Sequence, residues 1–135
     1  MIIDSLDTKH IMGLTSEYQH ARLWIADSLL FNQSGLLSAF EVTVRVLGGL
    51  LSTYCLSLDP LFLDKAANVA DRIMPISETP SGIPISFVDL KERVGHIDED
   101  NNGWNSLARW RLCSSSSSTI VILQMTIPIG RLRKE

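Results

Sequence analysis

The sequence predicts an all-α domain built from helical hairpins, and three observations support this class. Apolar residues recur at helical spacing within residues 38–57. Gly13 is a helix stop signal, and the pair Asp59-Pro60 is a helix start signal. The connections between successive helical patterns are short, which makes consecutive helices antiparallel neighbours. At 135 residues the chain is long enough for one domain with a hydrophobic core.

Composition and charge argue against several function classes. The net charge is −3 and no basic patch is present, so nucleic acid is not an expected partner. We expect no transmembrane segment, because no apolar run reaches bilayer length, and no signal peptide, because Asp4 follows directly after Met1-Ile2-Ile3. Cys55 and Cys113 form neither a disulfide framework nor a metal-ligand spacing, and Cys55 is expected in the core.

The first predicted helix covers residues 1–12 and ends at Gly13. Asp4 and Asp7 share one of its faces, since they are three positions apart. Two interpretations remain open at this stage. The two acids are either a functional carboxylate pair or first-turn acids that complement the helix dipole.

The second predicted helix is capped by Thr15 or Ser16. Its inner stripe, which we expect in the core, consists of Tyr18, Ala21, Ile25 and Leu29. Trp24 is also expected to pack in the core. An N-glycosylation sequon, Asn32-Gln33-Ser34, follows in a predicted loop.

Residues 38–57 are predicted to form the central helix of the domain. One apolar stripe comprises Phe40, Val44, Leu47, Leu51 and Tyr54, and a second comprises Val42, Val46 and Leu50. A helix that is apolar nearly all round is buried.

One narrow polar line interrupts the central helix, formed by Glu41, Arg45, Gly48 and Ser52. An acid and a guanidinium one turn apart can pair along a helix. A buried carboxylate costs several kcal/mol unless it is paired or functional. We therefore predict that Glu41 and Arg45 face a wet polar cavity and form a candidate site. The alternative is an ordinary solvated pair on a surface helix.

A further helix is predicted from Asp59 as N-cap and Pro60 in the first turn. Its core side is predicted to consist of Leu63, Ala66, Ala67, Ala70 and Ile73. Residues 75–105 read as one long irregular loop. Within it, Asp98–Gly103 fits the first half of a calcium-binding loop, but the twelfth position is Arg109 where a glutamate is required.

Four motifs occur in an order that resembles the class I α-1,2-mannosidases, glycoside hydrolase family 47. They are I-I-D-S-L-D-T at Ile2–Thr8, I-M-G-L at Ile11–Leu14, F-E-V-T-V-R-V-L-G-G-L-L-S at Phe40–Ser52 and T-P-S-G-I-P at Thr79–Pro84. The resemblance covers residues 1–108. The chain departs from the family pattern at Lys9-His10, where an apolar–aromatic pair is usual, and at Asp89, where asparagine is usual.

The resemblance implies a fragment of an (α/α)7 barrel from an enzyme that hydrolyses terminal α-1,2-mannose of high-mannose N-glycans with inversion. It makes Glu41 the catalytic acid and Arg45 a substrate-binding residue. It also implies calcium as cofactor, with the metal ligand and the catalytic base in segments outside this chain. The chain is expected to begin inside the family domain and to be inactive by itself. The resemblance places the parent in the secretory pathway (endoplasmic reticulum or Golgi lumen) or outside the cell.

Residues 109–135 are predicted to be a tail that does not belong to the family domain of residues 1–108. One interpretation of this tail is a Ser-rich linker, Ser114–Ser118, followed by a strand-like segment. The other is out-of-frame translation. A shifted frame starting at the third base of the Ala108 codon can spell E-V-A-T-L-Q-L-E-F-K-Y, much as family members continue.

Two alternatives to an enzyme fragment remain open. The first is a non-catalytic helical module that binds a glycan or a protein through Glu41 and Arg45. The second is a small unrelated α-helical domain, against which the four ordered motifs argue. If the chain folds alone, we expect exposed apolar surface and association.

Overall fold

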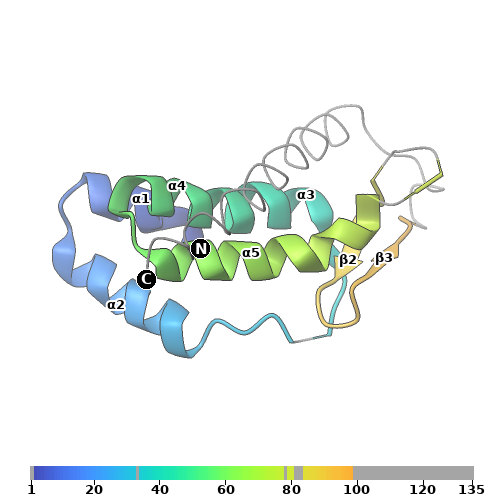
Figure 1. Ribbon diagram of the computed structural model, residues 1–135, viewed down its shortest axis with the longest axis horizontal. Helices are drawn as coiled ribbons and strands as arrows, with labels where there is room; N and C mark the ends of the chain where they lie inside the picture. The colour runs from blue at the N-terminus through green and yellow to red at the C-terminus, as the bar shows by residue number, and fades with distance from the viewer. Residues whose placement is uncertain (1, 33, 78, 81–83, 99–135) are drawn as a thin grey trace, which may run out of the picture.

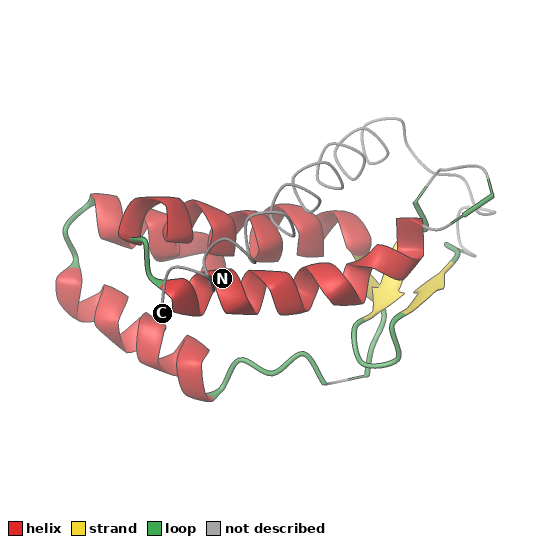
Figure 2. Cartoon of the chain, in the orientation of Figure 1, coloured by secondary structure: helices red, strands yellow, loops and turns green. Residues whose placement is uncertain are grey.

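The computed structural model describes residues 2–32, 34–77, 79–80 and 84–98, and helices dominate this part of the chain (Figure 1; Figure 2). A short 3-10 turn, η1 (Ile3–Ser5), leads into α1 (Leu6–Ile11). The helix ends before Gly13, which adopts a φ of 70° that favours glycine. The predicted first helix and its stop are confirmed.

The second helix, α2 (Thr15–Asp27), buries Tyr18, Ala21 and Ile25 as predicted. The predicted cap is wrong. Thr15 is already the first helical residue, and the capping position belongs to Leu14, whose side chain accepts no hydrogen bond. Leu29 is buried but lies beyond the end of the helix.

The central helix runs continuously from Ala39 to Ser57 in three parts. It consists of α3 (Ala39–Glu41), a π-helical segment η2 (Val42–Leu47) and α4 (Gly48–Ser57). Ser38 is the N-cap, because its hydroxyl accepts a hydrogen bond from the Glu41 N–H at 3.5 Å. The helix was predicted within these bounds, whereas its π segment was not.

Helix α5 (Pro60–Ile73) begins as the sequence predicts. Asp59 is its N-cap and accepts a hydrogen bond from the Leu61 N–H at 3.1 Å. The buried face differs slightly from the prediction, because Phe62 and Val69 are buried while Leu63 and Ala67 are half-buried. Helix α5 packs lengthwise against α4 (Figure 1). A 3-10 turn, η3 (Met74–Ser77), follows.

A small antiparallel sheet lies at one end of the helices, and two of its three strands fall within residues 75–105, which were predicted to be one long loop. Strand β2 (Phe87–Asp89) pairs with β1 (Leu37–Ser38) on one side and with β3 (Val94–His96) on the other. The long-loop prediction is therefore wrong for these residues. Strands of two or three residues are too short to show a period-2 pattern, and their pairing is long-range.

The core lies between the central helix, α5, α2 and α1. Its largest fully buried side chains are Phe62, Leu6, Ile25, Leu47, Leu50, Ile76, Val69 and Val88. The mostly helical character of the described chain confirms the helical class, and the sheet is an addition to it. The barrel itself stays a prediction.

Two expectations about the central helix need correction. By length and composition, Ala39–Ser57 is long and apolar enough to cross a membrane, contrary to the prediction that no such run exists. The helix also carries the charged Glu41 and Arg45, and it packs Leu47 and Leu50 into the core. It is also not buried all round, since Val44 and Leu56 are each 45% exposed and Cys55 is exposed rather than in the core.

Candidate functional site

The start of the central helix is held by the sheet. Ser38 pairs with Phe87 in the β1–β2 ladder, and the Ala39 N–H donates a hydrogen bond to the Ser86 carbonyl at 3.0 Å. The Ser38 hydroxyl then caps the first turn at Glu41. Glu41 is thus positioned by a strand as well as by its own helix.

The turn after Glu41 is widened into a π-helix. Within it, the buried Thr43 hydroxyl donates a hydrogen bond to the Ala39 carbonyl at 2.7 Å, and the Gly48 N–H bonds to the Thr43 carbonyl. π-helical segments are rare and occur frequently at functional sites. This one carries Arg45. Nothing in the apolar pattern of the sequence distinguishes it from an ordinary α-helix.

Arg45 joins two carboxylates from different elements. Its Nε forms an ion pair with Glu41 Oε2, and its Nη1 donates to Asp4 Oδ2 at 3.3 Å. The predicted pairing of Glu41 with Arg45 is confirmed. Asp4 is an additional partner, which comes from η1.

The same face of the central helix contacts the N-terminal helix again about two turns later. The Ser52 hydroxyl donates a hydrogen bond to Asp7 Oδ2 at 3.0 Å. Between these contacts the backbones approach closely, because a Cβ at Gly49 would lie 3.0 Å from the Ile3 carbonyl oxygen. We call the set Asp4, Asp7, Glu41, Arg45 and Ser52 the polar seam.

The contacts of the polar seam show which role Asp4 and Asp7 have in the structure. Each lies in the first turn of its helical segment, as the dipole interpretation requires. Yet Asp4 contacts Arg45, and Asp7 contacts Ser52. The two acids therefore form one side of an interface between the η1–α1 segment and the central helix.

The polar seam is partly open to solvent. The side chains of Glu41, Arg45 and Asp4 are 49%, 48% and 41% exposed, so the described residues do not enclose them. The central helix is not buried on all sides, and whether Glu41 and Arg45 face a cavity stays a prediction. A half-exposed carboxylate beside a guanidinium can exchange a proton with a ligand and can bind sugar hydroxyls.

Metal ligation is not supported by the described residues. Within residues 2–32, 34–77, 79–80 and 84–98, no three or more His, Cys, Asp or Glu side chains gather closely enough to hold a metal ion. Of the calcium-loop motif, Asp98 is buried, and positions 99–103 lie outside the described residues, as does Arg109.

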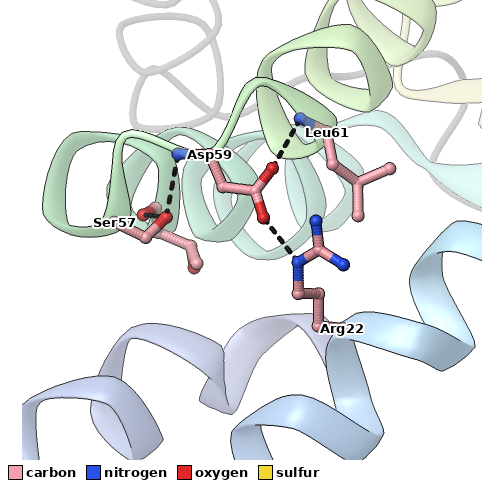
Figure 3. Close-up of polar contacts among 5 residues, drawn as sticks. Arg22, Ser57, Asp59 and Leu61 are labelled. Atoms are coloured by element: carbon pink, nitrogen blue, oxygen red, sulfur yellow. Dashed lines mark hydrogen bonds and ion pairs between the residues drawn. The ribbon is translucent and has the colours of Figure 1, made fainter.

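A second polar cluster joins α2 to the turn between α4 and α5 (Figure 3). Arg22 Nε donates to Asp59 Oδ2 at 2.5 Å, while Asp59 Oδ1 accepts from Leu61 and the Asp59 N–H donates to Ser57 Oγ at 3.3 Å. The hydrogen bond from Arg22 lowers the pKa of Asp59, and the same bond raises the pKa of Arg22. The hydrogen bonds of this cluster connect α2 to the turn between α4 and α5, and we interpret them as structural contacts. Sequence reasoning found Asp59 as a cap but had no signal for Arg22.

The carboxylate of Asp89, which stands where the family usually has asparagine, is hydrogen-bonded by backbone N–H groups. Its carboxylate accepts hydrogen bonds from the N–H groups of Glu92 at 3.1 Å, Gly35 at 3.0 Å and Lys91 at 2.8 Å. These bonds, with that from Glu92 the largest contribution, lower the pKa of Asp89. Asp89 ties the β2–β3 turn to the segment before β1.

The aromatic residues lie at differing depths. The Lys9-His10 departure is accommodated, since the His10 ring lies 5.0 Å from that of buried Tyr18, which in turn lies 6.3 Å from Phe62. Trp24 was expected in the core but is 40% exposed.

Comparison with known proteins places the chain among glycosidases. The model of glycosyl hydrolase family 47 matches residues 1–120. This match extends past Ala108, where the resemblance was predicted to end. Whether a boundary lies at residue 108 stays a prediction.

Several curated proteins are similar to this chain. A mannosyl-oligosaccharide 1,2-alpha-mannosidase of Arabidopsis thaliana is 50% identical over 95 residues, covering 70% of this chain and 17% of that protein. The endoplasmic reticulum mannosyl-oligosaccharide 1,2-alpha-mannosidase of Schizosaccharomyces pombe is 51% identical over 94 residues, covering 69% and 18%. Human mannosyl-oligosaccharide 1,2-alpha-mannosidase IB is 44% identical over 105 residues, covering 78% and 16%.

Proposed function

Because the chain belongs to glycosyl hydrolase family 47, we propose that it is part of an enzyme that removes terminal α-1,2-linked mannose from high-mannose N-glycans. The names of the similar proteins from Arabidopsis, fission yeast and human support this substrate class. The chain spans about a sixth of the length of these relatives, between 16% and 18%. The activity proposed is therefore that of a longer parent protein.

In this proposal Glu41 is the general acid. Its carboxyl group protonates the glycosidic oxygen while the bond from that oxygen to the anomeric carbon breaks. Inversion requires a water that attacks the opposite face of the sugar, and a second carboxylate that takes the proton from this water. The observation that carries the assignment is the position of Glu41, on a capped and sheet-anchored turn with its side chain half-exposed beside Arg45.

Arg45 binds the glycan in this proposal. Its Nε and Nη1 contact Glu41 and Asp4, whereas its Nη2 has no hydrogen-bond partner among the residues that the structure describes. A guanidinium carries five N–H donors, so it can hold both carboxylates and still donate to sugar hydroxyls. Asp4 contacts a different guanidinium nitrogen from Glu41 and so also positions Arg45.

Calcium, which the family implies, has no fitting donor set in the described residues. No step of the proposal is therefore assigned to calcium in this chain. We propose that the second carboxylate of the required pair comes from outside this chain, so the 135-residue chain alone is expected to release no measurable mannose. We also place the parent in the secretory pathway, since relatives include endoplasmic reticulum mannosidases.

A chimera tests the proposal. Residues 1–108 of this chain replace the matching segment of an active family 47 mannosidase, and mannose release from a defined high-mannose oligosaccharide is measured. We expect an active chimera whose initial product has the inverted anomeric configuration by NMR. The isolated 135-residue chain is assayed in parallel and should release no measurable mannose.

A binding module is the alternative that this assay can favour. If the chimera folds cooperatively and binds the oligosaccharide but releases no mannose, the segment does not support catalysis. That result would contradict the proposal and favour a non-catalytic role of Glu41 and Arg45.

A further inference from the structure

We propose that Asn32 is an N-glycosylation site, so that this glycan-processing chain itself carries a glycan. Asn32-Gln33-Ser34 is the single Asn-x-Ser/Thr triplet in the sequence, and proline occupies neither position 33 nor position 35. Gln33 lies outside the described residues, and only its residue type, which is not proline, is used in the inference. The inference rests on the proposed secretory location, because the transfer takes place in that compartment.

Both recognised side chains face solvent. Asn32 and Ser34 are exposed and lie in the connection between α2 and β1, whereas buried Leu29 and half-buried Phe31 of the same connection pack against the core. Within the described ranges, neither the Asn32 amide nor the Ser34 hydroxyl hydrogen-bonds another group. A glycan attached here displaces no packed or hydrogen-bonded side chain.

The connection is nevertheless held in place by its backbone. Lys65 Nζ donates to the Leu29 carbonyl at 2.8 Å, and Arg72 Nη1 donates to the Phe31 carbonyl at 2.7 Å. On the other side of the triplet, the Gly35 N–H donates to Asp89 Oδ2 at 3.0 Å. These anchors fix the backbone on either side of Asn32 and Ser34, whose exposed side chains present the acceptor amide at the surface.

The site lies away from the polar seam. In Figure 1 the connection between α2 and β1 runs on one side of α5, and the central helix with Glu41 and Arg45 runs on the other. Asn32 takes part in none of the contacts of the polar seam, so its modification removes none of them.

The transfer uses a pyrophosphate-linked oligosaccharide on a lipid carrier as donor. A bond forms between Asn32 Nδ2 and the anomeric carbon as the bond from that carbon to the phosphate oxygen breaks. The amide nitrogen loses one proton and the lipid pyrophosphate leaves. No oxidation or reduction is involved.

The test is translation of the full 135-residue chain, behind a cleavable signal sequence, in the presence of microsomes. We expect a mobility shift of one N-glycan that peptide N-glycosidase F removes, leaving aspartate at position 32. Asn32→Gln, Ser34→Ala and Gln33→Pro should each abolish the shift. Ser34→Thr should retain it, and Asn68→Gln, an exposed asparagine outside any triplet, is the matched control.

An unshifted chain overturns the proposal if a control secretory protein in the same reaction is glycosylated. A shift that persists in Asn32→Gln overturns it as well. Because the signal sequence is supplied and no mannose is measured, failure here is distinguishable from failure of the proposed location or activity.

Discussion

Arg45 donates a hydrogen bond to Asp4 at 3.3 Å, across 41 positions of the sequence. This contact joins the first helical turn to the π-helical turn that follows Glu41. The arginine is therefore oriented from two sides, by its own helix and by η1.

The Arg45–Asp4 contact should contribute little to stability. Both side chains are more than one-third exposed, and exposed pairs typically contribute about 0.2–1 kcal/mol because solvent and salt screen them. A double-mutant cycle with Asp4→Asn and Arg45→Gln, read by urea unfolding of the full chain, should give a coupling in this range. A coupling of about 3 kcal/mol, as for a buried pair, would show that the seam is enclosed.

Two neighbouring glycines should respond differently to alanine. A Cβ at Gly49 would meet the Ile3 carbonyl oxygen at 3.0 Å, so Gly49→Ala should destabilise the chain by about 1–3 kcal/mol. A Cβ at Gly48 would meet only the Thr43 carbonyl oxygen, at 3.6 Å, so Gly48→Ala should be neutral or stabilising by up to about 1 kcal/mol. Urea unfolding measures both. Equal effects would contradict the close approach of η1 and the central helix.

The Arg22–Asp59 pair should make stability depend on pH. The pKa of Asp59 is lowered in the folded state, so its contribution is present above the unfolded value of about 3.9 and is lost as pH falls through the folded pKa. At pH 7 Asp59→Asn should cost about 1 kcal/mol, a value kept small because Arg22 is one-third exposed. The cost should shrink progressively below about pH 4.

Asp64→Asn is the matched control for this experiment, since Asp64 is an exposed carboxylate of the same helix. Asp64→Asn should change the free energy of unfolding only slightly at pH 7 and at pH 3. If Asp59→Asn lowers stability equally at pH 7 and pH 3, the ion pair is not the source of the pH dependence.

The helices were predictable because their signals are local. Gly13 and Asp59-Pro60 act within one turn, and the apolar spacing of residues 38–57 is visible in sequence. The Glu41–Arg45 pair followed from the same spacing, since the two residues are one turn apart.

The contacts and strands that could not be predicted are formed between residues far apart in the sequence. Ser52 meets Asp7, and Arg22 meets Asp59, only after the helices have packed. The strands Leu37–Ser38 and Phe87–Asp89 are stabilised by each other across the fold, so neither has a pattern of its own. The exposed side of the central helix was not predicted, because it carries apolar residues such as Val44 as well as Glu41 and Arg45.

The hypothesis about the tail is tested by nucleotide sequence. We expect the transcript and genomic DNA across codons 100–135 to spell E-V-A-x-L-Q-L-E-F one frame over, beginning at the third base of the Ala108 codon. Bases that forbid this alternative reading would make residues 109–135 genuine coding sequence.

The most direct test of the account is Glu41→Gln in the chimera that carries residues 1–108. Removal of a general acid typically costs about 10²–10⁴-fold in rate, so kcat for mannose release should fall by this factor. Glu17→Gln, at an exposed glutamate of α2 away from the seam, should retain the parent kcat and supplies the control. If Glu41→Gln folds and keeps kcat within a few-fold of the Glu17→Gln control, Glu41 is not the acid and the central claim fails.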